Sequence, residues 1–256
     1  MEEQHLFSIL SKASYDYYHN GIQQAKEELK NYPQTKDWSI NEKLSNKNAT
    51  VLNNDNKIVI SYRGTDLKNP SDLIADTEIL LGRDKIKINL NDRFDEANNL
   101  YKKVKEEYPN SDITLTGHSL GSSEAIYVGT KNNTRSISFN EGTSPLDVLL
   151  SQFSYNKEIN KKQTVYITAK DIISNLSILE PYNIKYVEAK NDLNFLSHSL
   201  NYFLPKKEKE KLPEYLKSKY VPSFKTKKYI NENKNYANLY DTYGIDFFKE
   251  LALKKK

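Results

Sequence analysis

Ser119 lies between two glycines in the segment Gly117–Gly121, which reads GHSLG and has the pattern G-x-S-x-G. The chain has only 8 glycines among 256 residues, so two of them this close together need a reason. Glycine loses the most backbone entropy on folding and suits positions where no Cβ fits. The apolar run at 113–116 predicts a strand that feeds a sharp turn. Such a turn would expose its serine at the tip, and Ser119 is therefore a candidate nucleophile.

A nucleophilic serine needs a general base within hydrogen-bond reach, and histidine is the usual base because its pKa lies near neutrality. The chain has four histidines. His5 and His19 fall in a predicted N-terminal helix, and His118 on a tight turn points its side chain away from that of its neighbour. Hydrolases with a serine on a strand-to-helix turn have the chain order serine, acid, histidine. Only His198 follows the serine, so we predict it as the base.

The acid that orients the histidine should lie between Ser119 and His198, just after a strand. Asp171 follows the strand-like segment 164–168, and loops at the carboxyl edge of a parallel sheet are where sites gather in such folds. Asp171 is the first candidate. Asp192 is the second, because it lies close to the histidine in sequence.

The serine also needs donors that stabilise a developing oxyanion. One would be the backbone N–H of Leu120, the residue after the nucleophile. The segment 61–66, SYRGTD, suits the second, because a predicted strand ends at Tyr62 and Gly64 lets the backbone turn. Thr65 could then aim its N–H, and its hydroxyl, at the site. The predicted oxyanion hole therefore consists of Thr65 and Leu120.

The surrounding pattern alternates strands and helices. Apolar residues at helical spacing predict an amphipathic helix over 6–17, which Asn20-Gly21 would end or bend, and a second helix over 94–108. A helix also begins near Ser123. The expected strands are 50–52, 57–62, 113–116, 135–142, 164–168 and 183–189. We predict an α/β fold with a mostly parallel central sheet and helices on both faces.

Composition excludes several kinds of protein. Without cysteine, the chain has no disulfide framework, no cysteine-based metal site and no cysteine nucleophile. Its first residues lack the basic and apolar layout of a signal peptide, and no apolar run approaches the roughly 18 residues of a membrane span. We therefore expect a soluble protein, with a cytoplasmic location favoured.

The charge is uneven along the chain. Residues 206–256 hold 14 lysines and 7 acidic residues, whereas the rest holds 24 basic and 27 acidic ones. The composition changes at about Pro205, and we expect a domain over 1–204 followed by a basic, Lys- and Tyr-rich extension over 205–256 packed on the body. A basic face that meets anionic membrane lipid is the second reading of this extension. Nucleic-acid binding is disfavoured because no recognition motif accompanies the charge.

Beyond these separate signals, the sequence resembles the class 3 lipases, a branch of the α/β-hydrolase fold. The resemblance runs from about residue 6 to about 204. It rests on YRGTD, DLIADTEILLG, ITLTGHSLGSSEA, SFNEGTSP, VYITAKD and SHSLNYF. It implies a nucleophile at Ser119, an acid at Asp171, a base at His198 and an oxyanion hole at Thr65 and Leu120. Asp76 matches a family position that we interpret as structural.

Two departures bear on the substrate. The family continues the turn with glycine and alanine, whereas this chain has Ser122 and Ser123, which are still small enough for close packing. The segment 67–76, LKNPSDLIAD, is too short and polar for the apolar lid of the larger secreted members. Interfacial activation and a preference for long-chain triglycerides are therefore not expected.

The resulting hypothesis is a serine hydrolase that cleaves carboxylic esters of lipids, of lipase or phospholipase A1-like type, without metal or organic cofactor. Its expected partners are a lipid or small ester substrate and, through the basic extension, an anionic membrane surface. Two alternatives stay open. One is a non-catalytic hydrolase-like scaffold that binds lipid or protein. The other is different acyl chemistry, as in a thioesterase or acyltransferase, which uses the same three residues.

Overall fold

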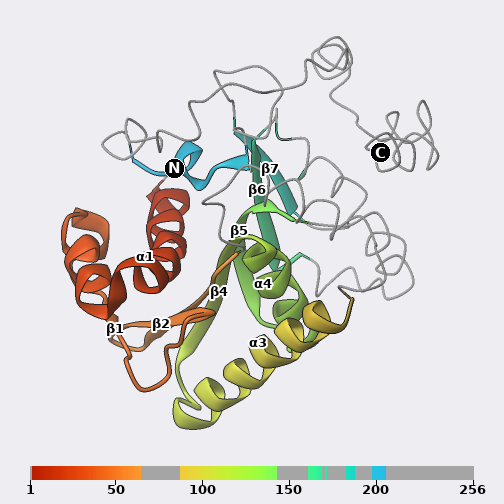
Figure 1. Cartoon of the computed structure of the whole chain (residues 1–256), viewed down its shortest axis with the longest axis horizontal. Helices are drawn as coiled ribbons and strands as arrows, with labels where there is room; N and C mark the ends of the chain where they lie inside the picture. Colours follow the sequence, from red (N-terminus) through yellow and green to blue (C-terminus); the bar gives the residue numbers. More distant parts are fainter. Residues whose placement is uncertain are drawn as a thin grey trace.

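In a computed structural model of the chain, one seven-stranded sheet runs through the molecule (Figure 1). The structure describes residues 2–64, 87–142, 161–168, 171, 174, 183–187 and 198–205. The strands stand side by side in chain order, β1 to β7. They are β1 (Ser39–Ile40), β2 (Ala49–Asn54), β3 (Lys57–Tyr62), β4 (Asp112–Ser119), β5 (Arg135–Glu141), β6 (Gln163–Thr168) and β7 (Asn183–Val187).

The sheet is mostly parallel, as the sequence predicted. Strands β3 to β7 pair in parallel, whereas β1, β2 and β3 pair antiparallel. The expected strands 50–52 and 57–62 lie in β2 and β3, which form a hairpin with Asn54 opposite Lys57 and a tight turn in which Asp55 has a φ of 49°. The short edge strand β1 was not predicted, because two residues carry no detectable alternation.

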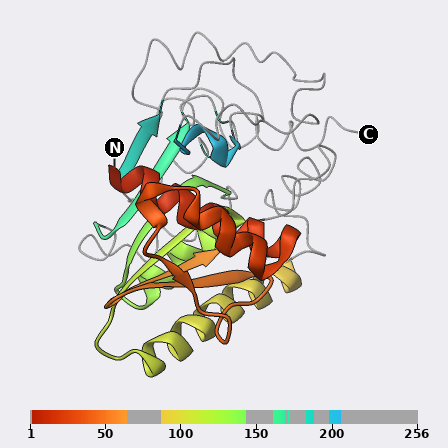
Figure 2. The same cartoon turned by 90° about the vertical axis from the view of Figure 1, so that its left-hand side faces the viewer.

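Helices cover both faces of the sheet (Figure 2). On one face, α1 (Glu2–Lys30) packs apolar residues such as Phe7, Leu10 and Leu29 against β2 and β5. On the other face lie α3 (Lys87–Glu107) and α4 (Leu120–Lys131), with Val104 and Val128 among their buried residues. Two apolar layers therefore sandwich the sheet, and the predicted fold class, an α/β-hydrolase fold, is confirmed.

Gly21 bends the first helix instead of ending it. Its φ of 82° and ψ of 170° are not helical, yet helical turns continue on both sides of it. The sequence predicted an end or a bend at this position, and the structure selects the bend. Both parts of the helix pack on the core, with Ala13 before the bend and Ala25 after it buried in the same apolar cluster.

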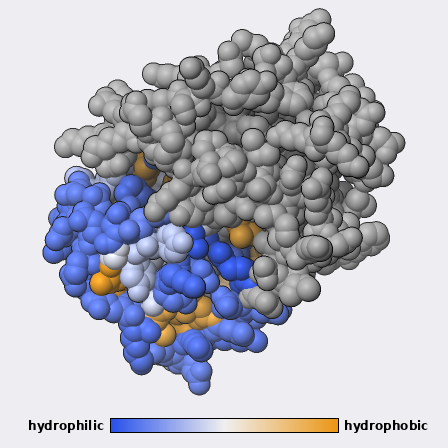
Figure 3. All heavy atoms as spheres, in the orientation of Figure 1, coloured by the Kyte–Doolittle hydropathy of each residue, from blue (hydrophilic) through white to orange (hydrophobic). Residues whose placement is uncertain are grey.

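Several sequence expectations lie outside the described residues. They are the basic extension over 206–256, the segment 67–76, Asp76 and Asp192. Among the helices of the described part, none is both long and apolar enough to cross a bilayer. The face of that part seen in Figure 3 is mostly hydrophilic, with small hydrophobic patches between hydrophilic residues.

Candidate active site

Ser119 stands at a sharp turn between strand β4 and helix α4. It is the last residue of β4, and Leu120 begins the helix directly. Its φ of 58° is a left-handed conformation that L-residues seldom adopt, so the backbone here is strained. The pairing with β5 also shifts register between His118 and Ser119. These features define the predicted strand–turn–helix elbow.

The two glycines of the elbow stand where neighbouring backbone leaves no room. A Cβ on Gly117 would lie 2.1 Å from the carbonyl oxygen of Gly121, and one on Gly121 would lie 2.2 Å from that of Tyr62. The glycines therefore let the turn close and let α4 approach β3. This is the reason inferred from the sequence, with one difference. Ser119 is only 5% exposed and its Oγ contacts His198, whereas the sequence predicted a serine exposed at the tip of the turn.

His198 reaches Ser119 from a segment far along the chain. Its Nε2 lies 2.8 Å from Oγ of Ser119, and its Nδ1 lies 2.7 Å from Oδ2 of Asp171. A carboxylate only accepts hydrogen bonds, so in the neutral ring Nδ1 carries the proton and donates to Asp171. Nε2 then accepts the hydrogen bond of the serine hydroxyl. The structure brings the three predicted residues into one buried chain of hydrogen bonds.

Asp171 follows β6, and its backbone N–H donates to the carbonyl of Thr168 at 2.9 Å. Its carboxylate is fully buried and also accepts a hydrogen bond from the hydroxyl of Ser174. This second donor fixes the carboxylate that faces the histidine. Sequence analysis missed Ser174, although a hydroxyl three residues after an aspartate is a typical local partner.

The predicted oxyanion hole is described in part. Leu120 is the first residue of α4, where the backbone N–H groups have no partner inside the helix. Gly64 lies beside the nucleophile, because a Cβ there would be 3.0 Å from Cβ of Ser119 and 2.4 Å from the carbonyl of His118. The segment ending at Gly64 therefore reaches the elbow. Thr65 itself lies outside the described residues.

Two arginines hold the backbone that leads to Gly64, and one of them is paired with an acid. Arg63 donates from Nε to the carbonyl of Lys47 at 2.8 Å and from Nη1 to that of Gly64 at 2.9 Å. Arg93 from α3 donates to the carbonyl of Arg63 at 2.7 Å and to Glu124 of α4 at 2.8 Å. Sequence analysis named none of these contacts, since all but the Arg63–Gly64 hydrogen bond join residues at least 16 positions apart.

Glu124 is a buried acid five residues after the nucleophile. Burial raises its pKa from 4.5 to about 7, although the nearby guanidinium of Arg93 acts in the opposite direction. Loss of hydration outweighs one ion pair here because the carboxylate is only 1% exposed. Its protonation therefore changes near neutral pH.

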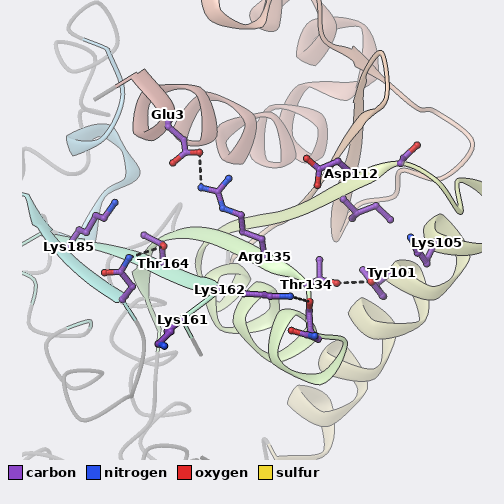
Figure 4. A pocket seen from close by; sticks show the side chains of 14 residues that line it. Glu3, Tyr101, Lys105, Asp112, Thr134, Arg135, Lys161, Lys162, Thr164 and Lys185 are labelled. Carbon is purple, nitrogen blue, oxygen red and sulfur yellow. Dashed lines mark hydrogen bonds and ion pairs between the residues drawn. The ribbon is translucent and has the colours of Figure 1, made fainter. Parts of the chain in front are cut away.

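Across the described ranges, no group of three or more histidine or acidic side chains could hold a metal ion. A groove of about 620 Å³ lies at the opposite, amino-terminal edge of the parallel strands (Figure 4). Basic side chains outnumber acidic ones in its lining, but Arg135 pairs with Glu3, and Lys105 and Lys162 donate to backbone carbonyls. We assign it no ligand, and it is separate from Ser119.

The class of protein follows from the fold and the site together: an α/β-hydrolase fold with a serine, a histidine and an aspartate in hydrogen-bond contact. A model of the family Lipase (class 3) matches residues 59–140, which include the RGT segment and the elbow. The resemblance to class 3 lipases is thereby confirmed, and the match supports a hydrolase of the lipase type.

Solved structures with a similar fold include several fungal lipases. Native Rhizomucor miehei lipase in its propeptide complex is 17% identical, with a TM-score of 0.47 over 80% of this chain and 78% of that one. Lip2 lipase from Yarrowia lipolytica is 14% identical, with a TM-score of 0.44 over 73% and 79%. Lipase II from Rhizopus niveus is 17% identical, with a TM-score of 0.44 over 68% and 73%. A comparison with curated proteins gave no match.

Proposed function

We propose that the chain is a serine hydrolase that cleaves carboxylic esters of lipids, with Ser119 as nucleophile, His198 as base and Asp171 as orienting acid. The observation that carries the proposal is the continuous hydrogen-bond chain from Oγ of Ser119 through His198 to Asp171. The class 3 lipase match supports the substrate class. Triacylglycerols and the sn-1 esters of phospholipids are the substrates we expect.

In the first half of the reaction, Nε2 of His198 takes the serine proton while Oγ attacks the ester carbonyl carbon. The carbonyl oxygen becomes an oxyanion, which accepts hydrogen bonds from the N–H groups of Leu120 and Thr65. Asp171 stays ionised and stabilises the imidazolium. The C–O bond to the alcohol then breaks, and the alcohol leaves with the proton from Nε2.

In the second half, water replaces the alcohol. Nε2 takes a proton from the water, whose oxygen attacks the acyl carbon on Ser119. The bond from that carbon to Oγ breaks, and the serine recovers its proton from His198. The free fatty acid leaves, and the enzyme returns to its starting protonation state. Every proton passes through one nitrogen, which explains why a single histidine suffices.

The test is hydrolysis of p-nitrophenyl esters from acetate to palmitate by the wild-type chain and by Ser119→Ala. We expect the variant to lose at least about 1,000-fold in kcat/KM without unfolding, because the remaining groups cannot supply a nucleophile. A fluorophosphonate probe should label Ser119 in the wild type, as located by peptide mass spectrometry. Circular dichroism of both proteins controls for folding.

The outcomes separate the alternatives. Full activity in Ser119→Ala would refute the assignment of the nucleophile. A folded wild type that neither turns over any ester nor takes the probe would favour a binding scaffold. Labelling at Ser119 without ester turnover would favour a thioesterase or acyltransferase, which can be tested with acyl thioesters and with added alcohol acceptors.

A further inference from the structure

His118, the residue before the nucleophile, contacts the backbone of His198. Nε2 of His118 lies 2.5 Å from the carbonyl oxygen of His198, and the two rings are 5.1 Å apart between centroids. A carbonyl oxygen only accepts, so Nε2 of His118 carries the proton and donates it. Two consecutive side chains of the elbow therefore contact His198: Ser119 contacts its ring, and His118 contacts its carbonyl.

Tyr15 of helix α1 contacts the other ring nitrogen of His118, Nδ1. Its hydroxyl oxygen lies 3.0 Å from Nδ1 of His118. With the proton of His118 on Nε2, Nδ1 is a free acceptor, and the tyrosine O–H donates to it. The same tyrosine oxygen lies against the backbone of Gly64, in the segment that leads to the predicted oxyanion hole. A Cβ on Gly64 would lie only 2.4 Å from that oxygen.

The protonation of both groups fixes the direction of these bonds. Burial lowers the pKa of His118 to about 3, with the nearby His198 acting in the same direction, so the ring is neutral with one N–H. Burial also raises the pKa of Tyr15 well above its usual value, against the lowering effect of the Arg63 charge, so the phenol keeps its proton. Neither group changes state at the pH where a serine hydrolase works.

We infer that Tyr15 and His118 form a positioning relay that sets the backbone of the general base and of the segment before the oxyanion hole relative to Ser119. The inference rests on the proposed function, and neither residue touches the reacting atoms. The relay joins the first helix, the elbow, the base and Gly64 through one hydroxyl and one imidazole. Among the described residues, His118 is the only group with a hydrogen bond to the carbonyl of His198.

The kinetic test uses matched substitutions. His118→Gln keeps a donor near the position of Nε2, whereas His118→Leu removes it. We expect kcat to fall about 100-fold in His118→Leu and to recover most of that loss in His118→Gln, with KM little changed, since misplacement of a catalytic group by about 1 Å can cost that much. Tyr15→Phe should lower kcat about tenfold, the equivalent of one hydrogen bond. Tyr17→Phe, on the same helix, is the control.

A second readout does not depend on turnover. With only four histidines, ¹⁵N-labelled histidine gives a resolvable spectrum, and single replacements assign each signal. We expect His118 as the neutral Nε2–H tautomer that does not titrate between about pH 5 and 9, given its lowered pKa. Thermal unfolding of each variant shows whether a loss of kcat reflects a loss of fold.

The inference is overturned if folded Tyr15→Phe and His118→Leu keep the wild-type kcat on an ester that Ser119→Ala cannot hydrolyse. It is equally overturned if His118 is found as the Nδ1–H tautomer or titrates near pH 6.5. If no ester is hydrolysed by the wild type, the proposed function fails instead. In that case the tautomer of His118 still tests the hydrogen bonds, because they require the proton on Nε2.

Discussion

The fold requires glycine at the elbow and at Gly21 for different physical reasons. Gly121 is needed for space, since a Cβ would meet the carbonyl of Tyr62 at 2.2 Å. Gly21 is needed for conformation, because its φ is 82° while nothing lies within 4 Å of a Cβ placed there. The first contact joins helix α4 to strand β3 beside Ser119. The requirement at Gly21 concerns only the backbone of α1, far from the nucleophile in the chain.

We predict that Gly121→Ala lowers kcat/KM at least tenfold and destabilises the fold by about 1–3 kcal/mol, because α4 must move away from β3. Gly21→Ala should cost about 1–3 kcal/mol through its backbone conformation, a region that only glycine adopts readily, and leave kcat/KM unchanged. Urea unfolding and ester hydrolysis measure both quantities. Equal loss of activity in the two variants would mean that the elbow effect is only general destabilisation.

At the scale of elements, the ion pair between Glu124 and Arg93 joins helix α4 to helix α3. Arg93 also donates to the carbonyl of Arg63, directly after β3. The pKa of Glu124 is raised to about 7 in the folded chain from 4.5. Between these values the folded state binds more protons than the unfolded state. This group therefore stabilises the fold fully below about pH 4.5, and the contribution is lost as the pH rises through 7.

We predict that Glu124→Gln removes this dependence, because an amide does not titrate. The wild type should lose on the order of 1–3 kcal/mol of unfolding free energy relative to the variant between pH 4.5 and 8. Urea unfolding at several pH values measures this difference. Glu106→Gln, at an exposed position of α3, is the control. A pH dependence that is the same in Glu124→Gln and the wild type would show that the buried carboxyl keeps an ordinary pKa.

The elements that position the site were largely predictable, whereas their cross-connections were not. G-x-S-x-G after an apolar run predicts an elbow, and chain order selects His198 and Asp171 because such hydrolases share it. Tyr15 could not be predicted in the same way. It is separated from His118 by 103 positions, and an aromatic residue on an amphipathic helix is typical of a core contact. Such contacts depend on how α1 packs on the sheet, which no local pattern encodes.

At the scale of the molecule, charge is segregated along the chain. Residues 1–205 carry a small negative balance, and residues 206–256 carry 14 lysines against 7 acidic residues. Lysines near an anionic bilayer contribute about 1 kcal/mol each, and salt screens that attraction. We propose that the extension brings the chain to anionic lipid, which would raise the local concentration of a lipid ester at the catalytic edge.

We predict that the full chain sediments with phosphatidylcholine vesicles that contain phosphatidylserine, and not with pure phosphatidylcholine, and that salt releases it. Replacing Lys254, Lys255 and Lys256 with glutamine should weaken binding severalfold. The matched control replaces Lys36, Lys102 and Lys103, three exposed lysines of the body. Equal weakening in both variants would show that net charge, and not the extension, governs binding, and no binding at low salt would refute the proposal.

The bond between Ser8 and Phe203 has a consequence for how the protein is made. The hydroxyl of Ser8 lies within hydrogen-bond distance of two carbonyls, that of His5 at 2.8 Å and that of Phe203 at 3.0 Å, and the second contact spans 195 positions of sequence. The base stands only five residues before Phe203. A nascent chain emerges amino end first, so α1 is available long before its partner segment. Closing so large a loop comes after the local contacts of the sheet have formed. Incomplete chains should therefore be inert, and hydrolysis should begin only once synthesis has passed the region of Phe203.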